Sequence, residues 1–355
     1  MFPSVVNAVI GAEAVQPAFW MIFALLFGVV MANFSGHAHL LILFATLLLF
    51  SGLDVLGYWY RGTEFVLGAH LEWWMGVGNI QFTSMGADLL WVPQHFLPAL
   101  MAVGLVMSGR RIGYSSLHFF GAIALPFWSP FVFFGALLCL FPLVVVTIAR
   151  QFKSHFVKGW LDYAVALVAF VPIYLYLTLS SGQAGQIGIN ILTRDLLFFA
   201  AVEFVLPVLA VVLISRRFTG MEWLAVALGV ATILVTLVLR FGLANDLPMR
   251  TTAIPFIVFA VLIANYLFDP RSGWIPGARV AALVILLVGA VTSYNEYYRL
   301  NVLDNSDETL RKHSYLEMTE CCDNGVDARA TDWFYQYHAE KNAVTGLLFG
   351  AVGAP

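Results

Sequence analysis

The residues of this chain best suited to acid–base chemistry lie in one polar, aromatic stretch, residues 51–90, and just beyond it. Asp54 directly follows an apolar run, in SGLDVLG, which predicts a carboxylate at a helix end near a membrane surface. It is either a surface acid or a general base or metal ligand that faces a cavity. Asp88 and His95 are seven residues apart, a spacing that puts two side chains on one face of a helix. The candidate catalytic residues are therefore Asp54, Glu72, Asp88 and His95.

A second set of residues has the chemistry of ligand binding. Asp246 and Arg250 are four residues apart in NDLPMR, and a guanidinium can bind two oxygens of a phosphate or carboxylate at once. The alternative is a local ion pair or an anchor at the membrane interface. Gln94, in WVPQHFLP, is a polar residue at a helix start that is expected to face a cavity rather than lipid. Trp73 belongs either to an aromatic belt or to the same site, and Arg194 follows a Gly-rich loop.

One further acid, Glu203, stands in the middle of an apolar segment, AAVEFVLP, where an ionisable residue is a functional candidate by default. A transporter would normally show more than one such acid. Cys321 and Cys322 are adjacent and fit neither a redox motif nor a zinc spacing, so no metal site is predicted. No phosphate-binding loop, nucleophile elbow or dinucleotide motif stands in a fitting context, and no cofactor is indicated.

The elements that position these residues must lie in a lipid bilayer. The chain has 355 residues, of which 61% are hydrophobic and 11% charged. A soluble domain has about 45–50% and about 25%, respectively. The net charge of −3 and the absence of a basic run exclude a nucleic-acid partner, and three cysteines exclude a disulfide-rich fold. The predicted fold class is an all-α integral membrane protein.

Ten apolar segments approach the roughly 20 residues that a spanning helix needs. They cover residues 16–34, 38–53, 91–108, 114–128, 130–149, 160–179, 196–215, 221–241, 251–268 and 276–293. We predict a transmembrane domain over residues 1–295 with a long outer loop at about 51–90. Within that loop we expect a short helix at about 69–77. Residues 296–355 carry 10 acidic and 5 basic side chains and are predicted to form a polar tail.

The orientation follows from the short loops, because Lys and Arg are enriched on the inner side. If the tail lies outside, the inner loops contain nine basic residues and the outer loops four. The inner ones are Arg110, Arg111, Arg150, Lys153, Lys158, Arg216, Arg217, Arg271 and Arg279, and the outer ones are Arg61, Arg194, Arg240 and Arg250. The tail and the candidate site residues are therefore expected on the outer face.

Together these features resemble the multi-pass GT-C-type glycosyltransferases and related bacterial surface-polysaccharide membrane proteins, over about residues 50–270. The resemblance is carried by the phrases SGLDVLG, HLEWW, WVPQH and NDLPMR, with Asp54, Glu72, Asp88, Asp246 and Arg250. It implies a sugar donor linked to a polyprenyl phosphate or diphosphate, a glycan or lipid acceptor, and a location in the bacterial inner (plasma) membrane. An acid would deprotonate the acceptor hydroxyl, and an arginine would hold the departing phosphate, in polysaccharide or glycolipid assembly.

Two other classes of protein fit the same residues. A transporter or flippase of lipid-linked glycans would use the outer groups as a gate and Glu203 as a coupling site. A non-catalytic subunit of a membrane complex would use the acidic tail to dock.

Overall fold

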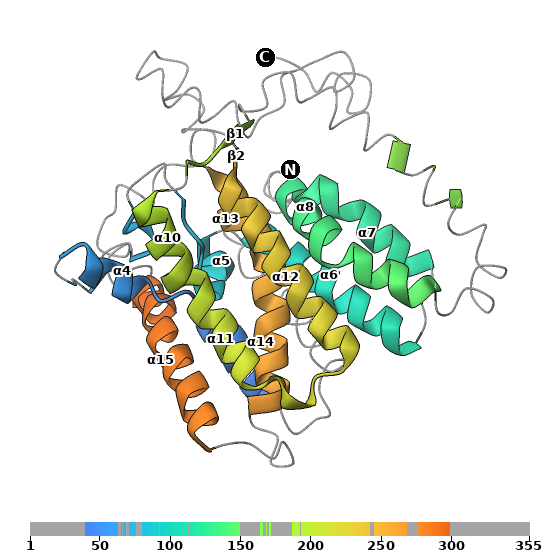
Figure 1. The fold of residues 1–355 in the computed structure, drawn as a ribbon. Helices are drawn as coiled ribbons and strands as arrows, with labels where there is room; N and C mark the ends of the chain where they lie inside the picture. Colours follow the sequence, from blue (N-terminus) through green and yellow to red (C-terminus); the bar gives the residue numbers. More distant parts are fainter. Residues whose placement is uncertain are drawn as a thin grey trace, which may run out of the picture.

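The computed structural model is a bundle of helices with one small two-stranded sheet (Figure 1). The structure describes residues 40–62, 65, 67–68, 71–75, 80–91, 93–112, 114, 116–149, 164–165, 168, 170–171, 187–191, 193–241, 245–267 and 276–298. Of the predicted spans, residues 16–34 and most of 160–179 lie outside these ranges, as does the tail beyond Tyr298.

The helices of the bundle are α3 (Leu40–Leu49), α4 (Asp54–Tyr60), α5 (Met85–Trp91), α6 (Pro93–Ile112), α7 (Ser116–Trp128), α8 (Pro130–Cys139), α10 (Arg194–Ala200), α11 (Leu206–Leu213), α12 (Gly220–Val238), α13 (Asp246–Thr251), α14 (Ala253–Leu267) and α15 (Pro276–Tyr298). Shorter helical turns are η2 (Leu71–Trp73), η4 (Ala201–Val205) and η5 (Ser215–Arg217). The strands β1 (Ile187–Ile189) and β2 (Leu239–Phe241) pair antiparallel, with Gly188 opposite Arg240.

Five helical stretches among the described residues are long and apolar enough to cross a membrane, and a sixth is counted if a bent pair is one span. The five are Leu43–Tyr60, Arg194–Leu213, Gly220–Val238, Leu247–Leu267 and Gly277–Tyr298, and the bent pair is Pro130–Cys139 with Phe141–Ala149. The helical architecture is thus confirmed and these helices are compatible with a membrane protein, whereas the count of ten is not reached in the described part. The segment at 114–128 forms only the 13-residue α7, and the apolar part of α6 is limited to His95–Gly109.

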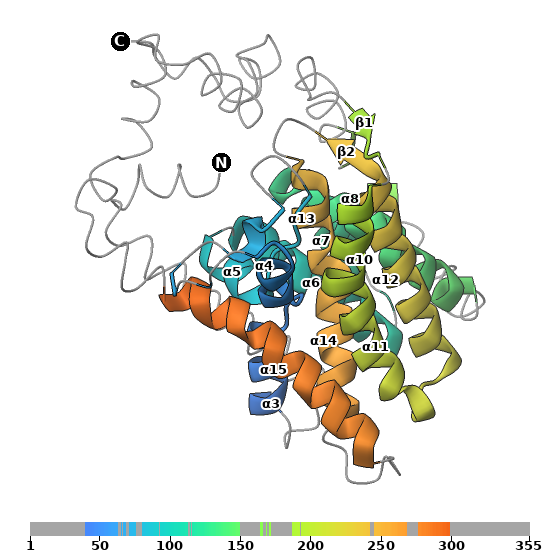
Figure 2. The ribbon, with the colours of Figure 1, turned by 60° about the vertical axis from the view of Figure 1, so that its left-hand side comes forward.

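The span Leu247–Leu267 lies at the centre of the bundle, with 94% of it buried. Its helix α14 packs against α3, α6, α8, α11 and α12, which explains a sequence that is apolar on every side. In contrast, α15 runs along one side of the bundle beside α3 (Figure 2). It exposes Val280, Val284 and Leu287, which recur at helical spacing and form a face suited to lipid.

The stretch at 51–90 differs from the predicted outer loop. It contains α4, η2 and α5, and Met85 N donates to Phe50 O at 3.0 Å, so the start of α5 is tied to the end of α3. Trp74, Phe82 and Met85 are buried in the core of the bundle. The short helix expected at 69–77 is a single turn, Leu71–Trp73. Apolar side chains at these positions draw the segment inward, because their burial outweighs contact with the headgroups.

Candidate functional site

Two acids from distant parts of the chain meet inside the bundle. Asp54 is the first residue of α4 and Glu203 is the central residue of η4; both are buried. Their carboxyl groups lie within hydrogen-bonding distance of each other. Trp74 Nε1 donates to Glu203 Oε1 at 3.0 Å, and Ser51 Oγ donates to Asp54 Oδ2 at 3.5 Å. A carboxyl pair in a low-dielectric interior is suited to binding and releasing protons.

Two more acids complete what we call the carboxyl centre, which consists of Asp54, Glu72, Glu203 and Glu296. Glu72 is buried on η2 and accepts a hydrogen bond from Ser84 N at 2.8 Å. Glu296 is fully buried near the end of α15, which packs on both α4 and η2. The helix α15 continues to Tyr298, so Glu296 belongs to the membrane body and not to a free tail.

Burial raises the pKa of the Glu72 carboxyl well above its ordinary value, and the nearby Asp54 and Glu296 carboxyls raise it further. The hydrogen bonds with Ser84 oppose this effect. The folded protein therefore keeps Glu72 protonated up to a higher pH than the unfolded chain does.

This pKa difference gives a prediction about stability. The folded state binds more protons than the unfolded state, so stability is present below the ordinary glutamate pKa and is lost as pH rises from there through the folded pKa. We expect Glu72→Gln, which can still accept from Ser84, to flatten this loss and to raise the alkaline unfolding temperature. The measurement is thermal unfolding in detergent across pH. An unchanged pH profile in Glu72→Gln would contradict the assignment.

The local helix geometry explains how Glu203 reaches Asp54. The five residues Ala201–Val205 form a π-helical turn between the α-helices α10 and α11. Such a turn is uncommon, costs hydrogen-bond geometry, and is frequent at functional sites. Gly52 provides the space, because a Cβ atom there would overlap the Glu203 carboxyl. Gly57 does the same for Trp74, since an added Cβ would overlap the indole ring.

A second group of polar residues gathers around Phe131. The Arg250 guanidinium carbon lies 5.4 Å from the Phe131 ring centroid, and His95 packs edge-on against the same ring. His95 Nδ1 is 2.7 Å from Ser129 Oγ. We call Asp88, His95, Ser129 and Arg250 the arginine group, because the Arg250 charge acts on the carboxyl of Asp88.

Asp88 is the least solvated member of the arginine group. It is fully buried, and neither of its carboxyl oxygens receives a hydrogen bond from the described residues. Burial raises the pKa of Asp88 well above its ordinary value, while the Arg250 charge lowers it. Arg250 is itself buried, which does not fit an anchor in the interface. A buried guanidinium beside a poorly solvated carboxyl is an arrangement that an incoming anion could join.

The helix α5 connects the two groups. Ser84, just before its first residue, holds Glu72, and Asp88 N donates to Ser84 O at 2.8 Å. Asp88 is therefore one helical turn from the Ser84 contact. Of the predicted residues, Asp54 and Glu72 fall in the carboxyl centre, whereas Asp88, His95 and Arg250 fall in the arginine group.

The other predicted residues are described only in part. The backbones of Trp73, Gln94 and Asp246 belong to η2, α6 and α13, and their side chains lie outside the described residues. Arg194 is exposed at the start of α10, beside Asp195, which forms an ion pair with Arg61 at 3.1 Å. Arg194 is thus at a helix end rather than in either buried group.

Sequence reasoning left three members of the site unassigned: Trp74, Glu296 and Ser129. Glu203 was singled out as a membrane acid but was not joined to Asp54. The signal for Glu203 was its depth in an apolar run. Glu296 carried the same signal at the end of the last apolar segment, but it was assigned to the polar tail.

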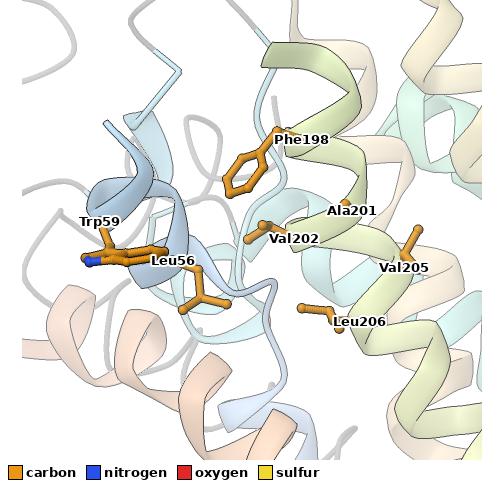
Figure 3. A pocket seen from close by; sticks show the side chains of 7 residues that line it. All are labelled: Leu56, Trp59, Phe198, Ala201, Val202, Val205 and Leu206. Carbon is orange, nitrogen blue, oxygen red and sulfur yellow. The ribbon is translucent and has the colours of Figure 1, made fainter. Parts of the chain in front are cut away.

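An apolar groove of about 360 Å³ opens on the outside of the same two helices that carry the Asp54–Glu203 pair (Figure 3). It is lined by Leu56, Trp59, Phe198, Ala201, Val202, Val205 and Leu206. Trp59 is 80% exposed, which is unusual for so large an apolar side chain unless lipid or a ligand covers it. At one end of the groove Tyr60 stacks on Phe198, with ring centroids 3.8 Å apart.

Within the described ranges, no group of three or more His, Cys, Asp or Glu side chains is arranged to hold a metal ion. The comparisons with known proteins add no relative: no protein-family model, no curated protein and no solved structure matches this chain.

Proposed function

We propose that this protein is a membrane-embedded transferase of the glycosyltransferase kind, which uses a polyprenyl-phosphate-linked sugar at the outer face of a bacterial inner membrane. The observation that carries this proposal is the apolar groove between α4 and η4, with the Asp54–Glu203 pair on the other side of the same helices. A groove of this composition suits the hydrocarbon part of a lipid-linked donor. The acids behind it suit proton removal from an acceptor hydroxyl.

The proposed reaction assigns a separate task to each group. Asp54 takes the proton from the acceptor hydroxyl, whose oxygen forms a bond to the anomeric carbon of the sugar. The bond from that carbon to the phosphate oxygen breaks, and the lipid phosphate departs. Arg250 would hold the departing phosphate, since its fork binds two oxygens. Glu72, Asp88 and His95 would tune the charge around these two residues.

The acids are closed from solvent in this structure, so the reacting ends need access. Leu56 on α4 and Val202 on η4 form part of the groove wall, on the two elements that also carry the acid pair. We propose that a substrate parts this wall when its lipid chain occupies the groove.

A substitution in the groove tests this proposal. Val205→Trp places a large ring in the groove wall, at a side chain that is already exposed, and should compete with the lipid chain. We expect the KM for the lipid-linked donor to rise by roughly tenfold, the equivalent of about 1.4 kcal/mol of binding, with little change in kcat. The assay is sugar transfer in proteoliposomes from a panel of polyprenyl-phosphate donors.

The matched control is Val212→Trp, on the same span, equally apolar and exposed, but outside the groove. It should leave the KM unchanged. Equal effects of the two tryptophans, or no transfer from any donor of the panel, would count against the proposal.

A second candidate function is a proton-coupled transporter or flippase of lipid-linked glycans. The observation in its favour is that Glu203 is accompanied by three other buried acids, which answers the objection that a transporter needs more than one. Movement of the same lipid donor across the vesicle membrane, driven by a pH gradient and without sugar transfer, would favour this alternative.

A further inference from the structure

The carboxyl centre concentrates negative charge without an equal supply of hydrogen-bond donors. Its members come from four separate elements, α4, η2, η4 and α15, and all are buried. The charges that act on Asp54, Glu72 and Glu203 are those of other carboxyls in the centre. In a medium of low dielectric constant, such charges repel each other strongly unless protons neutralise some of them.

Among the described residues, the other charged side chains of α10 and of the end of α4, Arg61, Arg194 and Asp195, lie towards solvent. Tyr58 on α4 is half-buried, and the Asp54 and Glu296 charges both act on it. At the end of α4, Arg61 pairs with Asp195 of α10, and both side chains are more than a third exposed. Because Arg61 is paired with Asp195, it does not neutralise the negative charge of Asp54 and Glu203. A proton shared within the carboxyl centre would neutralise that charge.

The hydrogen bonds of the pair leave one buried carboxyl oxygen without a donor among the described residues. Glu203 Oε1 accepts the indole hydrogen of Trp74, but Glu203 Oε2 is fully buried and receives no hydrogen bond from any donor of the described residues. The fully buried Thr292 hydroxyl is in contact with the Asp54 carboxyl. An ionised carboxylate only accepts hydrogen bonds, so two ionised carboxylates cannot bond to each other, whereas one protonated partner can donate.

We propose that Asp54 and Glu203 form a proton-binding site, in which the two carboxyls share one proton at neutral pH and accept a second one. The ligand is a proton from the aqueous phase, and the site would exist in a transferase and in a transporter alike. It therefore does not rest on the proposed function. If Asp54 is the base of a transfer reaction, the pair would hold two protons after the acceptor hydroxyl has lost its own, and Glu203 would be a positioning residue for Asp54.

Infrared difference spectroscopy of the full-length protein in proteoliposomes tests this directly. The spectrum of the wild type minus that of the double variant Asp54→Asn/Glu203→Gln isolates the two carboxyls. At neutral pH we expect the bands of one protonated acid and one carboxylate. At acid pH we expect two protonated acids, because an interacting pair titrates in two separate steps.

The control variant is Glu222→Gln, at the start of α12, where Glu222 accepts from Thr219 N at 2.6 Å and from Tyr266 Oη at 2.7 Å. Its difference spectrum isolates one carboxyl outside the pair, so bands that belong to Asp54 and Glu203 should be missing from it. Two carboxylates, or two protonated acids, in the double-variant difference at neutral pH would overturn the shared proton.

A second measurement covers the case in which the double variant does not accumulate. Dicyclohexylcarbodiimide is apolar and adds to protonated carboxyls, and the groove lined by Ala201, Val202 and Val205 lies on the same π-turn that carries Glu203. In wild-type membranes at neutral pH, mass spectrometry should find the adduct on Glu203 or Asp54 and not on Glu222. The absence of an adduct on both members of the pair would contradict the proposal.

Discussion

Replacing Asp54 by Asn is expected to lower the rate of sugar transfer by about 10²–10⁴-fold, the usual loss when a general base is removed. Asn has nearly the same shape as Asp and can still accept from Ser51, so the fold of α4 should be kept. The measurement is transfer from a lipid-linked donor in proteoliposomes, with the amount of protein in the membrane determined in parallel.

The matched control for this variant is Asp195→Asn, which removes a carboxylate from the exposed ion pair with Arg61. An exposed pair contributes little, about 0–1 kcal/mol, so activity should remain near that of the wild type. Equal activity of Asp54→Asn and the wild type would remove Asp54 from the mechanism and shift attention to the transporter alternative.

Removing the Arg250 guanidinium is expected to destabilise the protein by about 0.5–3 kcal/mol, because the buried Asp88 carboxyl loses the positive charge that acts on it. The Arg250→Ala variant leaves Asp88 buried without its positive neighbour. The loss should be partly reversed in Asp88→Asn/Arg250→Ala, because neither buried charge then remains. Unfolding temperature in detergent measures both effects, and Arg240→Ala, at an exposed position on β2, is the control.

The Arg250→Lys variant separates the two tasks of the residue. Lysine keeps the charge beside Asp88, so the stability should be largely retained. It lacks the two-pronged fork, so binding of a lipid phosphate should weaken and sugar transfer should fall. Full transfer activity in Arg250→Lys would show that only the charge matters, and the proposed phosphate contact would then be wrong.

The membrane class could be predicted because it follows from composition and from apolar run length, which do not depend on tertiary contacts. The spans around Glu203, Thr232 and Phe259 all follow from runs that the sequence displays directly. The count of spans could not be settled in the same way. Apolar helices such as α7 are too short to cross a bilayer, and an apolar run alone does not separate a buried helix from a spanning one.

The composition of the site could be predicted less well than its location. Asp54 and Glu72 both lie in the polar stretch from which candidate site residues are predicted, and both are buried. The pairing of Asp54 with Glu203 depends on how α4 packs on η4, which no local pattern encodes. Proximity in sequence was also misleading. Asp88 lies on α5 and His95 on α6, and the Arg250 charge acts on both, so they belong to the arginine group. Asp54 belongs to the carboxyl centre instead.

The π-turn at Ala201–Val205 makes the length of this helix as important as its composition. Such a turn contains one residue more than an α-helical turn, so a chain shorter by one residue here could form an uninterrupted α-helix with equal hydropathy. Side chains after the deletion would keep nearly the same direction, because the turn already takes up the extra residue within about one rotation of the helix. Leu206 would stay in the groove wall, and α11 would still face α14 and α15. The side chains inside the turn, Glu203 among them, would change direction, so a one-residue deletion in 201–205 would displace this buried acid without moving the helix that follows.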